Sequence, residues 1–197
     1  AEALDLSKED PKVRERYGKD DPNVQPYSNK GYQAIVSKFL AARRLVEAGA
    51  RFVTISYADF DWHSSNFKHG KKGIPLLDRA MTALVSDLHE RGMQDDVTVV
   101  VWGEFGRTPK INANAGRDHW ARSWSVVVGG AGMKGGIAVG ATNEDGTRVE
   151  TEPYSSQDVM ASVCKALGIS LQTTYTSNSG RPMKIANSGK VITELFS

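Results

Sequence analysis

Three short polar segments hold side chains that could act together on a ligand. They contribute carboxylates, imidazoles and one guanidinium, from Asp59, Asp61, His63, Glu104, Arg107, Asp118 and His119. Two histidines with a carboxylate suit zinc or another borderline divalent ion, and further carboxylates suit manganese, magnesium or calcium. A guanidinium can bind a tetrahedral anion through two hydrogen bonds. These residue types predict a divalent metal site beside an anion-binding group.

The metal ligands that the sequence favours come from all three segments. They are Asp61, His63, Glu104 and His119. Together they could hold one ion or share two, and two ions about 4 Å apart can clamp the oxygens of an in-line displacement at phosphorus or sulfur. Arg107 is the candidate for binding the anion. Asp59 and Asp118 are weaker candidates for the metal.

Each candidate also has an ordinary structural interpretation. Asp59 and Asp61 follow a predicted strand, where aspartate commonly forms turns. Glu104 and Arg107 could form an ion pair across a tight, glycine-flanked loop, and Asp118 could orient the histidine after it or cap a turn. The other histidines are expected to be solvated and the tryptophans to pack, namely His69, His89, Trp62, Trp102, Trp120 and Trp124.

Amphipathic helices are the first elements that must position these groups. Apolar residues at helical spacing predict helices over 31–48, 74–91 and 155–167. A glycine follows each of them, where helix C-caps favour glycine. Pro75 suits the first turn of the second helix, and Ser155 begins the third with the spacing of a capping box.

Strands complete the predicted fold. Runs rich in β-branched and aromatic residues predict strands over 51–57, 95–102 and 123–130. The middle run is almost wholly apolar, which is typical of a strand buried on both faces of a parallel sheet. Asp145-Gly146 predicts a small β-hairpin. The order favours an α/β fold, a mostly parallel sheet flanked by helices, with ligands bound beyond the carboxyl ends of the strands.

The bulk composition describes a globular chain with a sizeable core. It has 197 residues, 40% of them hydrophobic, and a net charge of +2. Charges of both signs are interspersed, so nothing indicates binding to nucleic acid or to a membrane surface. No apolar run approaches the roughly 20 residues that span a bilayer. The single cysteine, Cys164, excludes an internal disulfide and is expected to be a buried, inert thiol.

Several long motif strings resemble one bacterial family, the domain-of-unknown-function family 1501. The strings are YADFDWHSSNF, GEFGRTPKINANAGRDHW, GGAGMKGGIAVGATNEDG, LVEAGARFVTI and GRPMKIANSGKVITELF. The resemblance covers essentially the whole chain and is to the carboxyl-terminal half of longer proteins. It implies that 31–197 are the carboxyl-terminal half of an alkaline phosphatase-like α/β domain. The polar residues of 1–30, with the prolines and asparagines that follow them, predict a polar helix and a loose linker.

The resemblance also implies an activity, because that family is placed in the alkaline phosphatase superfamily, with the sulfatases. The intact protein would then be a metal-dependent hydrolase of phosphate or sulfate esters. By analogy, Asp61 and His63 form the superfamily's Asp…His loop. Glu104 takes the place of its strand-end Asp, and His119 that of its final His.

The sequence departs from the superfamily pattern in three ways. Asp61 and His63 are separated by one residue where three are usual, a spacing that Asp59 meets. Phe105 stands where the strand-end pair has a second histidine, which removes one ligand. The chain shows no nucleophile segment and no signal peptide. It is therefore expected to be inactive without a nucleophile-bearing half, which would also carry an export signal to the periplasm or beyond.

Two further expectations follow from the resemblance. If half of a sheet is absent, the missing half or another chain is expected along an exposed sheet edge. The substrate of the intact protein would be an anionic ester. The alternative is a non-catalytic structural or binding module with a vestigial metal site. The missing half and Phe105 favour this alternative.

Overall fold

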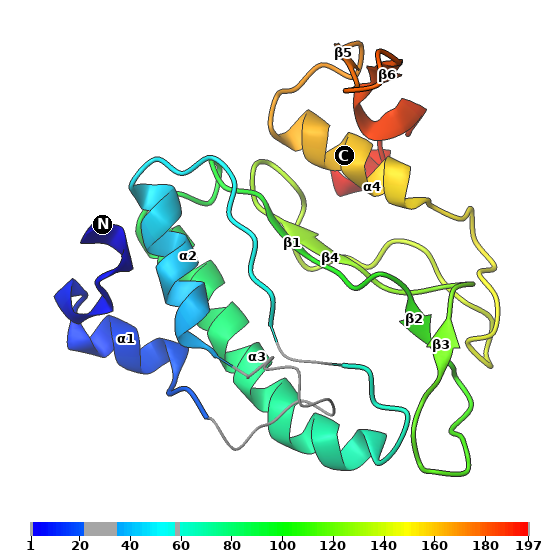
Figure 1. Cartoon of the computed structure of the whole chain (residues 1–197), viewed down its shortest axis with the longest axis horizontal. Coiled ribbons are helices and arrows are strands. Elements are labelled where there is room, and N and C mark those ends of the chain that lie inside the picture. Colours follow the sequence, from blue (N-terminus) through cyan, green and yellow to red (C-terminus); the bar gives the residue numbers. More distant parts are fainter. Residues whose placement is uncertain (1, 22–34, 58–59, 197) are drawn as a thin grey trace. The chain divides into compact units, whose positions relative to one another are not determined.

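The chain divides into two compact units that alternate along the sequence. The computed structural model describes residues 2–21, 35–57 and 60–196. The first unit consists of Ala1–Gly92 and Lys110–Asp118, and the second of Met93–Pro109 and His119–Ser197. The elements of both units are labelled in Figure 1.

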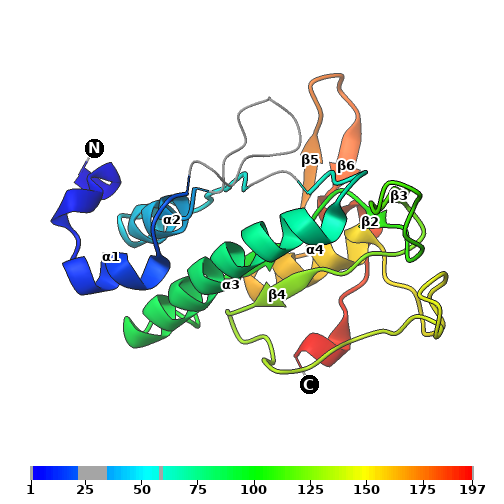
Figure 2. The ribbon, with the colours of Figure 1, turned by 90° about the horizontal axis from the view of Figure 1, so that it is seen from below.

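Helices build the first unit. They are η1 (Glu2–Leu4), η2 (Leu6–Lys8), α1 (Pro11–Tyr17), α2 (Ser37–Glu47) and α3 (Asn66–Glu90). The helices α1 and α2 lie beside the carboxyl-terminal half of α3 (Figures 1 and 2). The apolar side chains that they bury together are Tyr17, Val36, Phe39, Leu40, Ala80, Ala83, Leu84 and Leu88.

A buried cluster of charges joins these helices. Asp87 accepts hydrogen bonds from Tyr17 at 2.9 Å, from Arg43 at 2.8 Å and from Arg91 at 2.8 Å. Arg43, whose side chain is wholly buried, also pairs with Glu9. Burial disfavours the charged form of both carboxylates, but their hydrogen bonds outweigh it. These bonds lower the pKa of Asp87, and they lower that of Glu9 to about 2.

The helix α3 begins about two turns before the predicted start, so that Pro75 lies inside it. Ser65 precedes the helix with a left-handed backbone. The N–H groups of Ser65 and Asn66 donate to the carbonyls of Asn114 and Ala115, at 3.0 and 2.9 Å. A distant loop thus satisfies free N–H groups at this helix start, which the local sequence pattern does not reveal. Among the described residues, no helix is long and apolar enough to cross a membrane.

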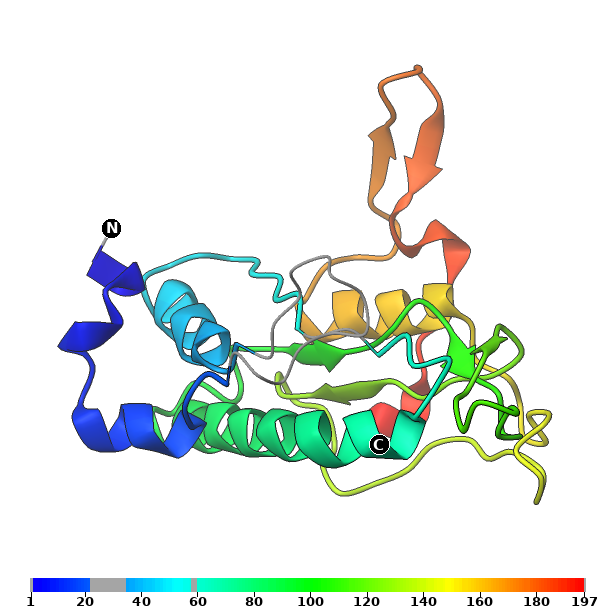
Figure 3. The ribbon, with the colours of Figure 1, turned by 60° about the horizontal axis from the view of Figure 1, so that its bottom comes forward.

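The second unit combines short strands with one α-helix. Its elements are β1 (Val99–Val101), β2 (Gly106–Arg107), β3 (His119–Trp120), β4 (Val127–Gly129), α4 (Ser156–Ala166), β5 (Thr174–Thr176), β6 (Pro182–Lys184), η3 (Ile185–Ser188) and η4 (Thr193–Leu195). The strands pair antiparallel as β1 with β4, β2 with β3, and β5 with β6. The β5–β6 hairpin projects away from α4 (Figure 3).

The predicted α/β fold with a mostly parallel sheet is wrong. The described strands form three separate two-stranded antiparallel ladders. The predicted strand at 51–57 has no regular secondary structure and pairs with no described strand, and the one at 123–130 pairs with β1 in the antiparallel sense. An apolar run indicates β structure and burial, but it does not give the direction of the partner strand. The predicted hairpin is reduced to one antiparallel bridge, Thr142 with Val149.

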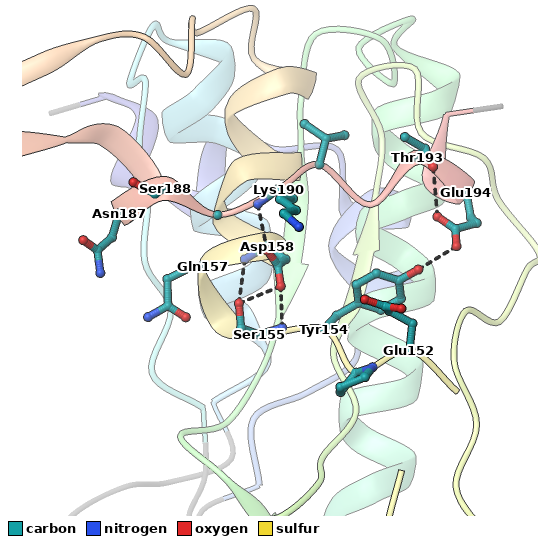
Figure 4. Close-up of a pocket in the computed structure, with 13 residues that line it drawn as sticks. Glu152, Tyr154, Ser155, Gln157, Asp158, Asn187, Ser188, Lys190, Thr193 and Glu194 are labelled. Carbon is teal, nitrogen blue, oxygen red and sulfur yellow. Dashed lines mark hydrogen bonds between the residues drawn. The ribbon is translucent and has the colours of Figure 1, made fainter. Parts of the chain in front are cut away.

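The predicted start of α4 is confirmed. The Ser155 side chain accepts from the Asp158 N–H, and the Asp158 side chain accepts from the Ser155 N–H, which makes a capping box. Asp158 also accepts from the Lys190 N–H at 2.7 Å, and Tyr154 donates to Glu194 at 2.6 Å. The residues that make these bonds line a polar hollow of about 630 Å³ (Figure 4). The bonds join the carboxyl-terminal segment to α4 and to the residue before it. Cys164 on α4 is buried, as predicted.

Candidate metal centre

A tight turn brings Asp61 and His63 together. The His63 N–H donates to the Asp61 carbonyl at 3.1 Å, which reverses the chain over three residues. The carboxylate oxygen Oδ1 of Asp61 then lies 2.9 Å from Nε2 of His63. The one-residue spacing therefore places the two candidate ligands side by side. Asp59, the alternative with the three-residue spacing, lies outside the described residues.

Trp62 anchors this turn. Its side chain is buried, with ring centroids 4.9 Å from Phe60 and 5.9 Å from His69. Its carbonyl accepts the Arg117 N–H at 3.0 Å. Trp62 thus packs, as the sequence predicted, whereas His69 stacks on it and is not simply solvated. The middle residue of the turn fixes the backbone from which the two ligands project.

The loop before Asp118 docks onto the turn through one asparagine. The Asn112 carbonyl oxygen Oδ1 accepts from the N–H groups of Asn114 and Gly116, at 3.0 and 2.9 Å. Its nitrogen Nδ2 donates to the His63 carbonyl at 3.0 Å and to Oδ1 of Asp118 at 3.1 Å. One side chain therefore closes its own loop and joins that loop to the turn.

Gly116 allows the two segments to approach this closely. A Cβ atom at this position would lie 2.1 Å from the carbonyl carbon and oxygen of His63. Real Cβ atoms essentially never come within 3.0 Å of such atoms, and a backbone atom cannot turn away as a side-chain end can. Glycine is therefore required for this contact.

Asp118 completes the cluster. Its Oδ1 lies 2.8 Å from Nδ1 of His63, so the imidazole lies between two carboxylates, Asp61 at Nε2 and Asp118 at Nδ1. From the sequence, Asp118 was expected to orient His119, the histidine that follows it. In the structure Asp118 contacts His63. The side chains of His63, Asp61 and Asp118 are 36%, 49% and 52% exposed, so solvent and small ligands can reach them.

The remaining candidates lie in the second unit. Arg107 on β2 pairs with His119 on β3, and residues directly opposite in an antiparallel ladder project from the same face. The Phe105 ring lies 4.5 Å from the His119 ring and 5.5 Å from the Arg107 guanidinium, measured between centres. Glu104 is exposed in the loop between β1 and β2. A Cβ at Gly106 would meet a backbone oxygen at 2.0 Å, so β2 also needs its glycine.

Within one unit, the structure brings together Asp61, His63 and Asp118. Sequence reasoning missed two residues that build this cluster, Asn112 and Gly116. The signal was present in NANAG, since asparagine followed two residues later by another turn former is typical of a side-chain-closed turn. It gave no indication of which distant segment the turn would contact.

The cluster has the chemistry of a cation site. A neutral imidazole carries one N–H and one lone pair, so between two carboxylates one nitrogen must present its lone pair to an anion. A cation at that nitrogen removes the conflict. Asp61 and His63 each offer a ligand atom that metals accept, a carboxylate oxygen and an imidazole nitrogen. With metal bonds of about 2.0–2.2 Å at tetrahedral angles, two ligand atoms lie roughly 3.4 Å apart, so Asp61 and His63, now 2.9 Å apart, would separate slightly around an ion.

Fold and site define an α+β chain with a histidine held between carboxylates. The sequence model of one family, described as "Protein of unknown function (DUF1501)", matches residues 1–196. The chain belongs to this family, so the predicted family is confirmed, while its placement in the alkaline phosphatase superfamily stays a prediction. No curated protein and no solved structure matches the chain.

Proposed function

We propose that the chain binds one divalent metal ion through Asp61 and His63, in support of the hydrolysis of phosphate or sulfate esters. The observation that carries the metal proposal is the position of His63 between two carboxylates, 2.9 Å from Asp61 and 2.8 Å from Asp118. The resemblance of the motif strings to the alkaline phosphatase superfamily supports the ester chemistry.

The His63 contacts favour a metal at one nitrogen in particular. If Nδ1–H donates to Asp118, Nε2 is left with its lone pair toward Asp61. Both of these groups are metal ligands, and both are partly exposed. His119 stays a ligand predicted from the sequence, as a second imidazole. One carboxylate and two imidazoles suit zinc or a similar divalent ion.

The surroundings of His119 support an anionic substrate. Arg107 projects from the same face of the β2–β3 ladder, and its guanidinium can bind a tetrahedral anion through two hydrogen bonds. The apolar ring of Phe105 lies beside His119 at the position where the superfamily has another ligand, which favours one ion over two. When bound, the ion supplies Lewis-acid polarisation of an ester oxygen. Glu104 stays a predicted ligand of the same or a second ion.

Metal binding is tested by titrating the purified, metal-stripped chain with Zn²⁺ and with Mn²⁺ in a calorimeter. We expect one ion per chain, with binding abolished in His63→Ala and weakened by at least about tenfold in Asp61→Ala. His89→Ala is the matched control, because His89 is exposed on α3 away from the turn. Binding that survives His63→Ala would sink the metal proposal.

The ester chemistry needs a separate assay. The full-length natural protein, loaded with the metal that the titration selects, is offered a panel of phosphate and sulfate monoesters. Turnover that falls in Arg107→Ala while the metal content stays constant supports the assignment. No turnover with any ester from fully loaded protein rejects the hydrolase while leaving the metal site in place.

A structural role is the second candidate, and one observation favours it. Both nitrogens of His63 lie within hydrogen-bonding distance of a carboxylate, so an imidazolium could donate to Asp61 and Asp118 without any metal. His63 would then only join the turn to the Asn112 loop. A chain that binds no divalent ion, yet loses stability in His63→Ala, would establish this role.

A further inference from the structure

We infer that the β5–β6 hairpin is a basic arm, which binds an acidic loop on a second copy of this chain. The basic arm is the hairpin from residue 174 to residue 184, and the acidic loop is residues 142–152. Both belong to the second unit. The association involves neither Asp61 nor His63, so its test is independent of the proposed function.

Charges are segregated in the part of the second unit that carries the loop and the arm. Residues 142–158 contain five acids and one base, whereas residues 159–190 contain four bases and no acid. Arg181 and Lys184 are the bases of the arm, and both are exposed. The ladder pairs Lys184 with Thr174, which carries no charge. The arm therefore has a positive charge that its own segment does not neutralise.

The arm also has the form of a surface that a partner covers. All residues of β5 are exposed, and in β6 only Met183 is partly buried. Tyr175 and Met183 are opposite each other in the ladder and project from one face, and Tyr175 is 51% exposed. A two-stranded hairpin is marginally stable by itself in water. Tyrosine and methionine are enriched in protein interfaces, so this face can supply apolar contact beside the charges.

A tight turn presents the acids of the loop. The Asn143 side chain closes the turn, because it accepts hydrogen bonds from the N–H groups of Thr147 and Arg148, at 2.8 and 2.9 Å. The exposed acids lie within the turn and just after it, namely Glu144, Asp145, Glu150 and Glu152. Arg148 is the one base of the loop and lies 3.4 Å from Glu150. The loop therefore keeps a net negative charge on an ordered backbone.

The arm and the loop of one chain lie at different ends of the second unit (Figures 1 and 3). A second copy offers each of them a surface of opposite charge, and complementary charges favour association and fix its orientation. Every copy carries one arm and one loop, so two copies that exchange these contacts form a closed dimer. Charge complementarity thus selects a second copy as the occupant of the arm.

Sedimentation equilibrium of the chain at low ionic strength tests the inference. We expect the average mass to rise with concentration toward that of a dimer. High salt should return it to that of the monomer, because salt screens exposed charges. The arm variant, Arg181→Glu with Lys184→Glu, should associate at least about tenfold more weakly. Lys12→Glu with Lys71→Glu is the matched control and should associate as the wild type does, since it makes the same change in net charge at exposed residues of the first unit.

An exchange of charge gives the sharpest outcome. The loop variant, Glu150→Lys with Glu152→Lys, should associate as weakly as the arm variant. An equimolar mixture of the two variants should associate again, because each arm then meets a loop of opposite charge, and this recovery also shows that both variants are folded. A wild type that stays monomeric at low salt, an arm variant that associates like the wild type, or a mixture that stays monomeric would overturn the inference. A monomeric wild type that binds poly-glutamate would instead assign the arm to an acidic segment of another protein.

Discussion

At the scale of single residues, the site depends on which histidine receives which carboxylate. Asp118 and His119 are neighbours in the sequence, which suggested one functional pair. In the structure Asp118 contacts His63, and His119 stacks on Phe105. The residue types predicted that carboxylates and imidazoles would act together, and the structure brings Asp61 and Asp118 to either side of His63. The partners themselves follow from contacts between distant segments.

Gly116 is the residue on which those contacts depend most directly. Gly116→Ala would place a methyl group 2.1 Å from the His63 carbonyl, so the loop must move away. We expect a loss of about 1–3 kcal/mol in unfolding free energy, as in other overpacked sites. We also expect zinc affinity to fall, because Asp118 moves with the loop. Chemical denaturation and zinc titration of the same variant measure both effects.

Gly135→Ala is the matched control for this prediction. The added Cβ meets no atom within 4 Å, and the backbone of Gly135 is not in the left-handed region. Its stability should stay within about 0.5 kcal/mol of the wild type. If Gly116→Ala were as well tolerated as this control, the close contact between the loop and the turn would be wrong.

At the scale of elements, the buried charges of the first unit predict how its stability depends on pH. The folded-state pKa of Glu9 lies at about 2, below the ordinary 4.5, and that of Asp87 lies below 3.8. Lowered carboxylate pKa values stabilise the fold above the unfolded-state pKa, and this stabilisation is lost as pH falls through the folded-state pKa. Unfolding free energy should therefore decrease from about pH 4.5 to about pH 2.

Asp87→Asn isolates the central carboxylate of this cluster. It removes the charge that faces the wholly buried Arg43, and breaking such a buried pair typically costs about 3–5 kcal/mol. Urea denaturation, monitored by the circular dichroism of the helices, should show this loss near neutral pH. The unfolding free energy of the variant should also decrease less as the pH falls. Asp78→Asn changes an exposed carboxylate on the same helix and should have little effect. A loss no larger than that of Asp78→Asn would contradict a stabilising role.

Helices were predicted better than strands, for a physical reason. The ends of α2, α3 and α4 follow from local rules, and Gly49, Gly92 and Gly168 adopt the positive φ expected after a helix. The start of α3 was wrong because loop carbonyls from Asn114 and Ala115 satisfy its first N–H groups. The strands were found where apolar runs lie, but their direction and pairing depend on partners far along the chain.

At the scale of the whole molecule, the order of the two units explains why the site was only partly predicted. The chain enters the second unit at Met93, returns to the first for Lys110–Asp118, and re-enters the second at His119. The boundary thus separates Asp118 from His119. The sequence predicted one parallel sheet with its ligands at one edge. In the structure, the Asp61–His63–Asp118 cluster forms because the segment Lys110–Asp118 belongs to the helical first unit.

Metal binding should be visible in the stability of the whole chain. A ligand that binds the folded state alone raises the unfolding free energy by RT ln(1 + [L]/Kd), which is about 2.7 kcal/mol at 100 times Kd. Calorimetric scans with increasing Zn²⁺ should therefore show a midpoint that rises with the logarithm of the free ion and returns on chelation. His63→Ala should show no such rise, and His89→Ala should show all of it. An equal rise in both variants would mean that the ion binds elsewhere, since His63 lies between Asp61 and Asp118 and His89 does not contact them in any described bond.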